Sequence, residues 1–263
     1  MTGKKNVSLP CAVGSTSYID TVKNSYYVDK TLLIRDLIDD HAAVTLFTRP
    51  RRFGKTLAVD MLKVFFEKTD EDNSVYPVIY ITFKDVKFDN WKDSLEAIRL
   101  VIRDEYMRHA EILSWDGLDV VEKDYLDRMQ KGTLSNVEYT RALLNLSRML
   151  EKYHNKKIVV LIDEYDTPIQ QGHSKGFYNE VITFMRNFMS GGLKDNLALA
   201  FGVLTGILRV SKENLFSGLN NLVVNSVLDE KYSEYFGFTS DEVTTMAAYY
   251  GREDKLNELQ EWY

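Results

Sequence analysis

The chain has 263 residues, of which 44% are hydrophobic, 12% aromatic and 27% charged, and its formal net charge is −6. This length and composition are typical of one large folded domain, and they exclude a disordered, collagenous or coiled-coil protein. The acidic balance argues against a protein coated in nucleic acid, and no apolar run approaches the ~18 residues of a membrane span.

The cysteine and histidine content excludes two further classes of site. The single cysteine, Cys11, rules out an internal disulfide and a cysteine-based zinc site, and it is consistent with a reducing cytosol. The four histidines have no metal-ligand spacing, so we predict surface or boundary positions for His41, His109, His154 and His173. The first residues lack a secretory pattern, and we therefore expect a cytoplasmic protein.

Five apolar segments predict strands. Residues 43–48 form a run rich in β-branched and aromatic residues, and residues 57–66 after it have helical spacing. Similar strand-like runs occupy residues 78–83, 158–162, 197–204 and 222–228. Continuous apolar runs are typical of parallel strands covered on both faces. The sequence therefore predicts a three-layer α/β fold with a mainly parallel sheet.

The remaining segments predict helices. Residues 90–155 carry helical patterns at 91–106, 118–129 and 137–153, the last opened by a capping box at Ser135 and Glu138. A second capping box, at Thr239 and Glu242, precedes a helix over 243–250, and a further helix follows it. We predict one main α/β domain over 1–235 with a helical insert at about 90–155, and over 236–263 the start of a C-terminal helical subdomain in a longer protein.

The loop between the first strand and its helix has the pattern of a phosphate-binding site. In the Walker A pattern G-x-x-x-x-G-K-[ST], Gly54, Lys55 and Thr56 supply the second half, and Arg49 stands in place of the first glycine. Gly54 permits a close approach of the backbone, Lys55 reaches the phosphates and the Thr56 hydroxyl binds Mg²⁺. A chance tripeptide at a helix start is the alternative.

A second motif supports this prediction. The apolar run at 158–162 ends in Asp163 and Glu164, which is the form of a Walker B element. We predict that Asp163 holds Mg²⁺ through water and that Glu164 is the general base for an attacking water. The alternative is that both carboxylates cap the next helix. Asp166 is predicted to be either a helix N-cap or an orienting partner.

Four more residues are candidates for this site. Thr205 ends the strand at 197–204, which we expect between the two motif strands, so its side chain can touch the γ-phosphate or the water. Arg209 can stabilise phosphoryl transfer from its own subunit or from a neighbour. Arg51 and Arg52 lie inside the loop and can contact phosphate or an acidic partner. The alternative for Thr205 is that it simply ends a strand. The alternative for the three arginines is that their charges are exposed to solvent and contact no ligand.

Several longer motifs, in this order, resemble the AAA-ATPase-like family of bacterial and archaeal ATP-binding proteins. They occupy residues 26–33, 48–57, 162–169, 206–222 and 236–239. The resemblance implies a P-loop NTPase fold and ATP. It also implies that residues 26–30, with Tyr27 as the candidate, contact the base or ribose. Longer members carry a C-terminal nuclease-fold domain that this chain lacks, so nucleic acid is expected as a partner only through that missing domain.

These predictions combine into one functional hypothesis. We expect a Mg²⁺-dependent ATP-binding module that hydrolyses ATP to drive a conformational switch, and we expect an unknown protein partner. Residues 51–57 are expected to bind the nucleotide: Arg51, Arg52, Phe53, Gly54, Lys55, Thr56 and Leu57. The alternatives are a small-molecule kinase and a scaffold that binds ATP without hydrolysing it. We expect a monomer or weak oligomer.

Overall fold

A computed structural model describes residues 9–12, 14–67, 76–208, 215–216 and 222–261. In this part of the chain, five parallel strands form one sheet in the order β2-β3-β4-β1-β5. Their bounds are β1 Val44–Thr48, β2 Val78–Thr82, β3 Ile158–Asp163, β4 Leu199–Gly206 and β5 Leu222–Ser226. β4 therefore lies between β1 and β3, as the sequence predicts. All five strands end at the same edge of the sheet.

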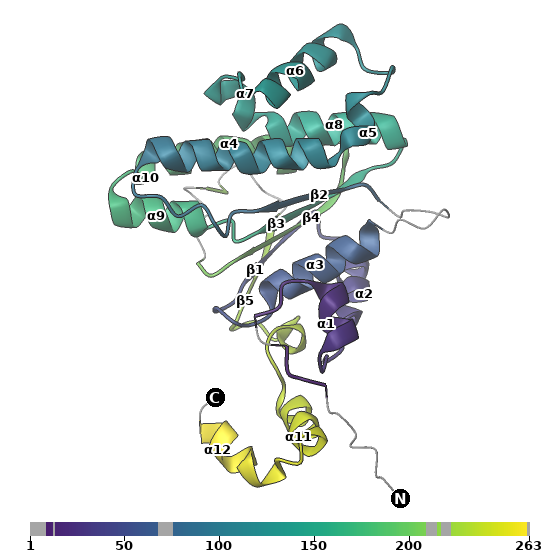
Figure 1. Cartoon of the computed structure of the whole chain (residues 1–263), viewed down its shortest axis with the longest axis vertical. Helices are drawn as coiled ribbons and strands as arrows, with labels where there is room; N and C mark the ends of the chain where they lie inside the picture. The colour runs from purple at the N-terminus through teal and green to yellow at the C-terminus, as the bar shows by residue number, and fades with distance from the viewer. Residues whose placement is uncertain (1–8, 13, 68–75, 209–214, 217–221, 262–263) are drawn as a thin grey trace, which may run out of the picture.

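Helices cover both faces of this sheet, which gives the predicted three layers (Figure 1). One face carries α4, α8 and α10, with α6 and α7 outside them. The bounds are α4 Trp91–Arg108, α5 Ala110–Leu113, α6 Val120–Lys131, α7 Asn136–Thr140, α8 Ala142–His154, α9 Thr167–Lys175 and α10 Tyr178–Leu193. The other face carries α1 Tyr18–Asn24, α2 Leu32–Asp39 and α3 Lys55–Phe66.

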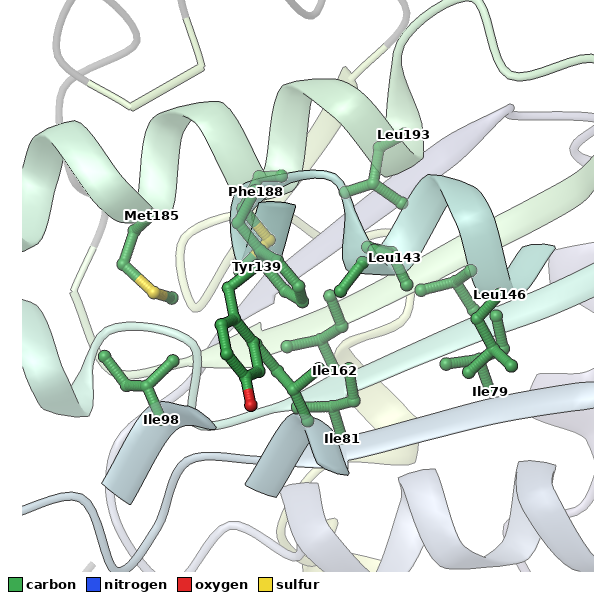
Figure 2. Packing of buried hydrophobic residues seen from close by; sticks show 14 of the residues in the cluster. Ile79, Ile81, Ile98, Tyr139, Leu143, Leu146, Ile162, Met185, Phe188 and Leu193 are labelled. Atoms are coloured by element: carbon green, nitrogen blue, oxygen red, sulfur yellow. The ribbon is translucent and has the colours of Figure 1, made fainter. Parts of the chain in front are cut away.

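Two hydrophobic clusters hold these layers together, one on each face of the sheet. Figure 2 shows part of the larger cluster, in which Ile79, Ile81 and Ile162 from the strands lie near Leu143 and Phe188 from the helices. The smaller cluster packs α2 and α3 under the same strands through residues such as Val59, Leu161 and Val203. Strand residues thus alternate between the two clusters.

The C-terminal residues form a small helical unit below the α3 face, close to the N-terminal segment (Figure 1). It contains η1 Ser233–Tyr235, α11 Ser240–Tyr249, η2 Glu253–Lys255 and α12 Leu256–Glu261. The Tyr250 hydroxyl donates to the Leu9 carbonyl at 2.7 Å, and the Tyr249 hydroxyl accepts from the Leu9 amide at 2.8 Å. Both ends of the described chain therefore pack together.

Most predicted elements are present, with corrected bounds. The predicted helix over 137–153 is wrong, because Arg141 divides it into α7 and α8. The strand predicted from 197 begins at Leu199, because 197–198 lie in a turn after Asn196. The strand predicted to 228 ends at Ser226, whose amide and hydroxyl both donate to Asp229. Both predicted capping boxes are confirmed.

One histidine prediction is also wrong. His109 is buried, with 5% of its surface exposed. Its two ring nitrogens lie 3.2 Å from carboxylate oxygens of Glu105 and Glu111. Burial opposes the charged form of His109, but these two carboxylates outweigh it, and the pKa of His109 is raised. The histidine belongs to an ionic cluster at the end of α4, in which Glu105 is buried and Arg108 reaches the surface.

No helix in the described ranges is long and apolar enough to cross a membrane.

Candidate active site

The loop that joins β1 to α3 turns sharply just before the helix begins. Arg52 and Gly54 both have left-handed backbones, with φ of 70° and 75°. Around Gly54, no heavy atom of the described residues lies within 4 Å of the position that a Cβ would occupy. α3 begins at Lys55, so the unpaired amides of its first turn face the same loop. A left-handed turn at a helix N-terminus is a typical anion-binding arrangement.

Lys55 folds back over this loop. Its Nζ donates to the carbonyl oxygens of Arg49 at 3.0 Å and of Pro50 at 2.8 Å, and 6% of the residue is exposed. Burial lowers the pKa of Lys55, while the charges of Glu164 and Asp163 act in the opposite direction. The ammonium group is therefore held against the backbone of the loop, where the charges of both carboxylates act on it.

Asp163 joins the loop helix to the centre of the sheet. Its Oδ2 accepts a hydrogen bond from the Thr56 hydroxyl at 2.8 Å, and its Oδ1 accepts one from the Thr205 hydroxyl. Asp163 is fully buried, and this burial raises its pKa, although the two hydroxyl donors and Lys55 counteract the shift. The structure therefore brings together Thr56, Asp163 and Thr205. The Thr205 side chain therefore contacts the Asp163 carboxylate, and a catalytic role for Thr205 stays a prediction.

Glu164 leaves the sheet in a left-handed conformation with φ of 52°. Such a backbone costs a non-glycine residue on the order of 1 kcal/mol or more, so neighbouring contacts must maintain it. The Thr167 hydroxyl donates to Glu164 Oε2 at 3.0 Å, and the Glu164 amide points to Thr205 Oγ1 at 3.4 Å. Its side chain is half-buried, so it remains accessible beside Asp163.

Arg49 has a role that the sequence did not predict. The residue is 2% exposed, and its guanidinium donates to the carbonyl and the side-chain oxygen of Asn225 at 2.9 and 2.5 Å. The same group lies 4.9 Å from the centre of the Phe236 ring. Arg49 thus joins the start of the loop to the end of β5 and to the C-terminal unit. No sequence signal identifies Asn225 or Phe236 as its partners.

A second contact connects the loop to the C-terminal unit. The Gly237 amide donates to the carbonyl oxygen of Phe53 at 3.2 Å. Gly237 has φ of 76°, and a Cβ there would lie 3.2 Å from the Phe53 ring. The Phe53 side chain therefore packs against the residues that lead into α11, and its main chain remains in the loop.

The other predicted site residues are more scattered. Arg51 and Arg52 are exposed on the loop, and Leu57 is half-buried on the first turn of α3. The Tyr27 hydroxyl contacts the sulfur of Met61 at 3.7 Å, on the second turn of α3. Arg209 lies outside the described residues.

The neighbours of Tyr27 contact the C-terminal unit. Lys30 Nζ lies 2.5 Å from Glu242 Oε1 on α11, and the Tyr26 ring packs against Tyr249 with 4.5 Å between ring centres. The segment over 26–30 therefore bridges α3 and α11. Tyr27 itself is half-buried, and burial raises its pKa to about 12, so it is a neutral hydroxyl.

The side chains and backbone groups of this site fit a nucleotide bound together with Mg²⁺. A hydroxyl and a carboxylate, those of Thr56 and Asp163, are the oxygen ligands that Mg²⁺ prefers, usually with water between. Lys55 and the left-handed loop supply positive charge and backbone amides for phosphate oxygens. The open space at Gly54 allows the ligand to approach the main chain.

The family model described as "Predicted AAA-ATPase" matches residues 12–216. The chain belongs to the AAA-ATPase-like family. The match includes the loop, Asp163, Glu164 and Thr205, and it confirms the resemblance seen in the sequence motifs. A family of this kind suggests an ATPase that uses ATP.

A relative in Azotobacter chroococcum mcd 1 is 29% identical over 257 residues, which are 97% of this chain and 48% of the relative. It is named "Uncharacterized protein in vnfD 5'region". This chain therefore spans about half the length of the curated relative it matches. No solved structure matches the chain.

Proposed function

We propose that this chain binds ATP with Mg²⁺ and hydrolyses it, using a P-loop NTPase fold. The observation that carries the proposal is the convergence of Lys55, Thr56, Asp163 and Glu164 at one end of a parallel sheet. The position of β4 between the two motif strands supports assignment to the branch of these enzymes that has a glutamate after Walker B. A ligand at the carboxyl ends of parallel strands is the usual arrangement in open α/β sheets.

The residues have distinct proposed roles. Lys55 and the amides of residues 51–57 bind the phosphates, and Thr56 and Asp163 hold the metal shell. The metal, when bound, neutralises charge that develops on the phosphoryl oxygens. Glu164 accepts a proton from the attacking water, a role that requires only hydrogen-bond reach to that water. Thr205 keeps the Asp163 carboxylate oriented, because its hydroxyl donates to Oδ1.

Hydrolysis is proposed to drive a conformational switch in the C-terminal unit. The contacts that support this are the hydrogen bond from Gly237 to Phe53 and the packing of Phe236 against Arg49. A change in the backbone of the phosphate loop must therefore alter at least one contact of the C-terminal unit. Arg209 as a catalytic arginine, a monomeric or weakly associating state and a cytoplasmic location remain predictions.

The binding half of the proposal is tested with Lys55→Ala. Hydrogen bonds to charged groups contribute about 1.5–3 kcal/mol each, so ATP affinity should fall by roughly 10- to 100-fold or become undetectable. Binding is measured by titration with a fluorescent ATP analogue in the presence of Mg²⁺. Lys63→Ala is the matched control, because this lysine lies on the same helix with its Nζ 3.9 Å from Glu67. Unchanged affinity in a folded Lys55→Ala protein would refute the site.

The catalytic half is tested with Glu164→Gln. This variant should bind ATP normally and release phosphate about 10²- to 10⁴-fold more slowly, which is the usual contribution of a general base. Phosphate release is measured with no added acceptor, so a small-molecule kinase would give no signal. A scaffold would bind ATP tightly without turnover. Equal turnover in wild type and Glu164→Gln would exclude Glu164 as the base.

A further inference from the structure

The carboxylate of Asp166 is buried close to the proposed base. Asp166 is 1% exposed and lies two residues after Glu164. Its Oδ2 accepts hydrogen bonds from the amides of Ile207 at 3.0 Å and Leu208 at 2.7 Å, and from the side-chain amide of Gln170 at 2.7 Å. Asp166 occupies the N-cap position of α9, but among the described residues its side chain accepts no capping bond from that helix. The carboxylate instead holds the backbone that follows β4.

The rest of this turn is fixed to the same backbone. The Tyr165 amide donates to the Thr205 carbonyl at 3.1 Å, and the Tyr165 hydroxyl donates to the Leu208 carbonyl at 2.6 Å. Gly206 lies directly beneath the turn, since a Cβ there would be 2.6 Å from the Tyr165 ring and 2.7 Å from Asp166 Oδ1. The turn over 164–166 and the end of β4 therefore form one closely packed unit.

This packing leaves one buried polar atom of Asp166 without a hydrogen bond. Within the described part of the chain, Asp166 Oδ1 is buried and has no hydrogen-bond partner. A buried carboxylate oxygen without a donor is costly, so stability alone is a poor explanation for an aspartate here. The backbone of Glu164 is also strained, as its φ of 52° shows. Strained and incompletely paired groups beside a reactive centre are characteristic of functional positioning.

We propose that Asp166 is the positioning residue for Glu164. It fixes the turn to the backbone of Ile207 and Leu208. This turn sets the backbone of Glu164, whose amide points to Thr205 and whose carboxylate accepts a hydrogen bond from Thr167. Asp166 acts through Glu164 and does not contact the nucleotide. This inference rests on the proposed function, because it requires Glu164 to be the base.

The test is a double-mutant comparison of ATP hydrolysis with Asp166→Ala, Glu164→Gln and the double variant. Asp166→Ala should lower kcat by about 10- to 100-fold, the cost of a displacement near 1 Å, with little change in KM for ATP. In the Glu164→Gln background, Asp166→Ala should cause almost no further loss, because it acts through the side chain already removed. If the fold-losses in kcat of the two single variants multiply in the double variant, the proposal is overturned.

Two further variants separate positioning from a general loss of structure. Asp166→Asn retains an oxygen that can accept from both backbone amides, so it should recover most of kcat. Tyr165→Phe removes the hydrogen bond to Leu208 but keeps the ring, and it should lower kcat without changing KM. If Asp166→Ala does not fold, an unchanged kcat in Tyr165→Phe would overturn the proposal. Gln170→Ala is the control, because both backbone bonds remain.

The outcomes distinguish this inference from the proposed function. Wild-type turnover in Glu164→Gln would refute the base and Asp166 together. A slow Glu164→Gln combined with wild-type turnover in Asp166→Ala would refute the positioning role alone.

Discussion

Arg49 and Asn225 are expected to be energetically coupled, although they lie 176 residues apart in the chain. The perturbation is a double-mutant cycle with Arg49→Ala, Asn225→Ala and the double variant. Asn225→Ala leaves a buried guanidinium with one hydrogen bond fewer, which costs about 1.5–3 kcal/mol for a charged donor. Arg49→Ala removes the same bond, the bond to the Asn225 carbonyl and the contact with the Phe236 ring. Such a cation–ring contact contributes up to about 2 kcal/mol when desolvated.

The loss of stability expected for Arg49→Ala is partly offset, because the substitution also removes the cost of burying the guanidinium charge. Burial lowers the pKa of Arg49, which means that the folded protein already bears a cost for its charge. We therefore expect Arg49→Ala to lower the free energy of unfolding by about 3–4 kcal/mol, and the coupling energy of the cycle to be about 1–3 kcal/mol. A loss of this size is a substantial part of the ~5–15 kcal/mol that stabilises a typical domain.

The assay is urea unfolding without nucleotide, followed by the intrinsic fluorescence of the three tryptophans. Arg35→Ala is the matched control, since the side chain of Arg35 is 61% exposed and bonds to the adjacent Asp36. It should leave the unfolding free energy unchanged within the error of the measurement. A coupling energy below about 0.5 kcal/mol between Arg49 and Asn225 would refute the reasoning.

Two further predictions concern buried groups. The pKa of His109 is raised in the folded protein, so its stabilising contribution is complete below its unfolded pKa of about 6.5 and is lost as pH rises through the folded value. The difference in unfolding free energy between wild type and His109→Gln should therefore shrink from about pH 6 to pH 9, and a constant difference would contradict the prediction. Gly206→Ala should lower stability by about 1–3 kcal/mol and also slow phosphate release, because its Cβ would be 2.6 Å from Tyr165. An equally stable and active variant, by urea unfolding and phosphate release, would exclude the close packing seen at this glycine.

The strands and the phosphate loop were predictable because their signals are local. A strand buried on both faces is a continuous apolar run, and a phosphate loop has its glycine, lysine and hydroxyl at adjacent positions. The break at Arg141 has no such signal, since neither glycine nor proline occurs near it. Both sides of the break pack closely against α10, where a Cβ on Gly192 would lie 2.2 Å from Leu143 and one on Gly191 would lie 3.5 Å from the Thr140 carbonyl. Tertiary contacts of this kind override local helix propensity.

The hydrogen-bond partners of Asp166 and Arg49 could not be predicted for a related reason. The sequence leaves two alternatives open for Asp166, a helix N-cap and an orienting partner. Its position before a helix is typical of an N-cap. Its actual partners, Ile207 and Leu208, lie more than 40 residues away, and the sequence has no mark that connects them. The sequence predicts a surface or boundary position for His109 because the four histidines have no metal-ligand spacing, but carboxylates at i−4 and i+2 provide partners for burial.

The hydrophobic pattern of the strands also determines the direction of the site residues. In β3, Val159 and Leu161 belong to the cluster on the α3 face, whereas Ile158, Val160 and Ile162 belong to the opposite cluster. Successive side chains of a strand alternate between faces, so the next residue, Asp163, faces α3, which begins with Lys55 and Thr56.

The same reasoning applies to β4. Val203 packs in the α3-face cluster, and Thr205, two residues later, faces the same side and meets Asp163. A shift of one residue in either strand would bury these polar groups among the apolar side chains of the opposite cluster. The core and the site are therefore specified by one pattern, because the residues that bury each strand also turn its final polar side chain toward the phosphate loop.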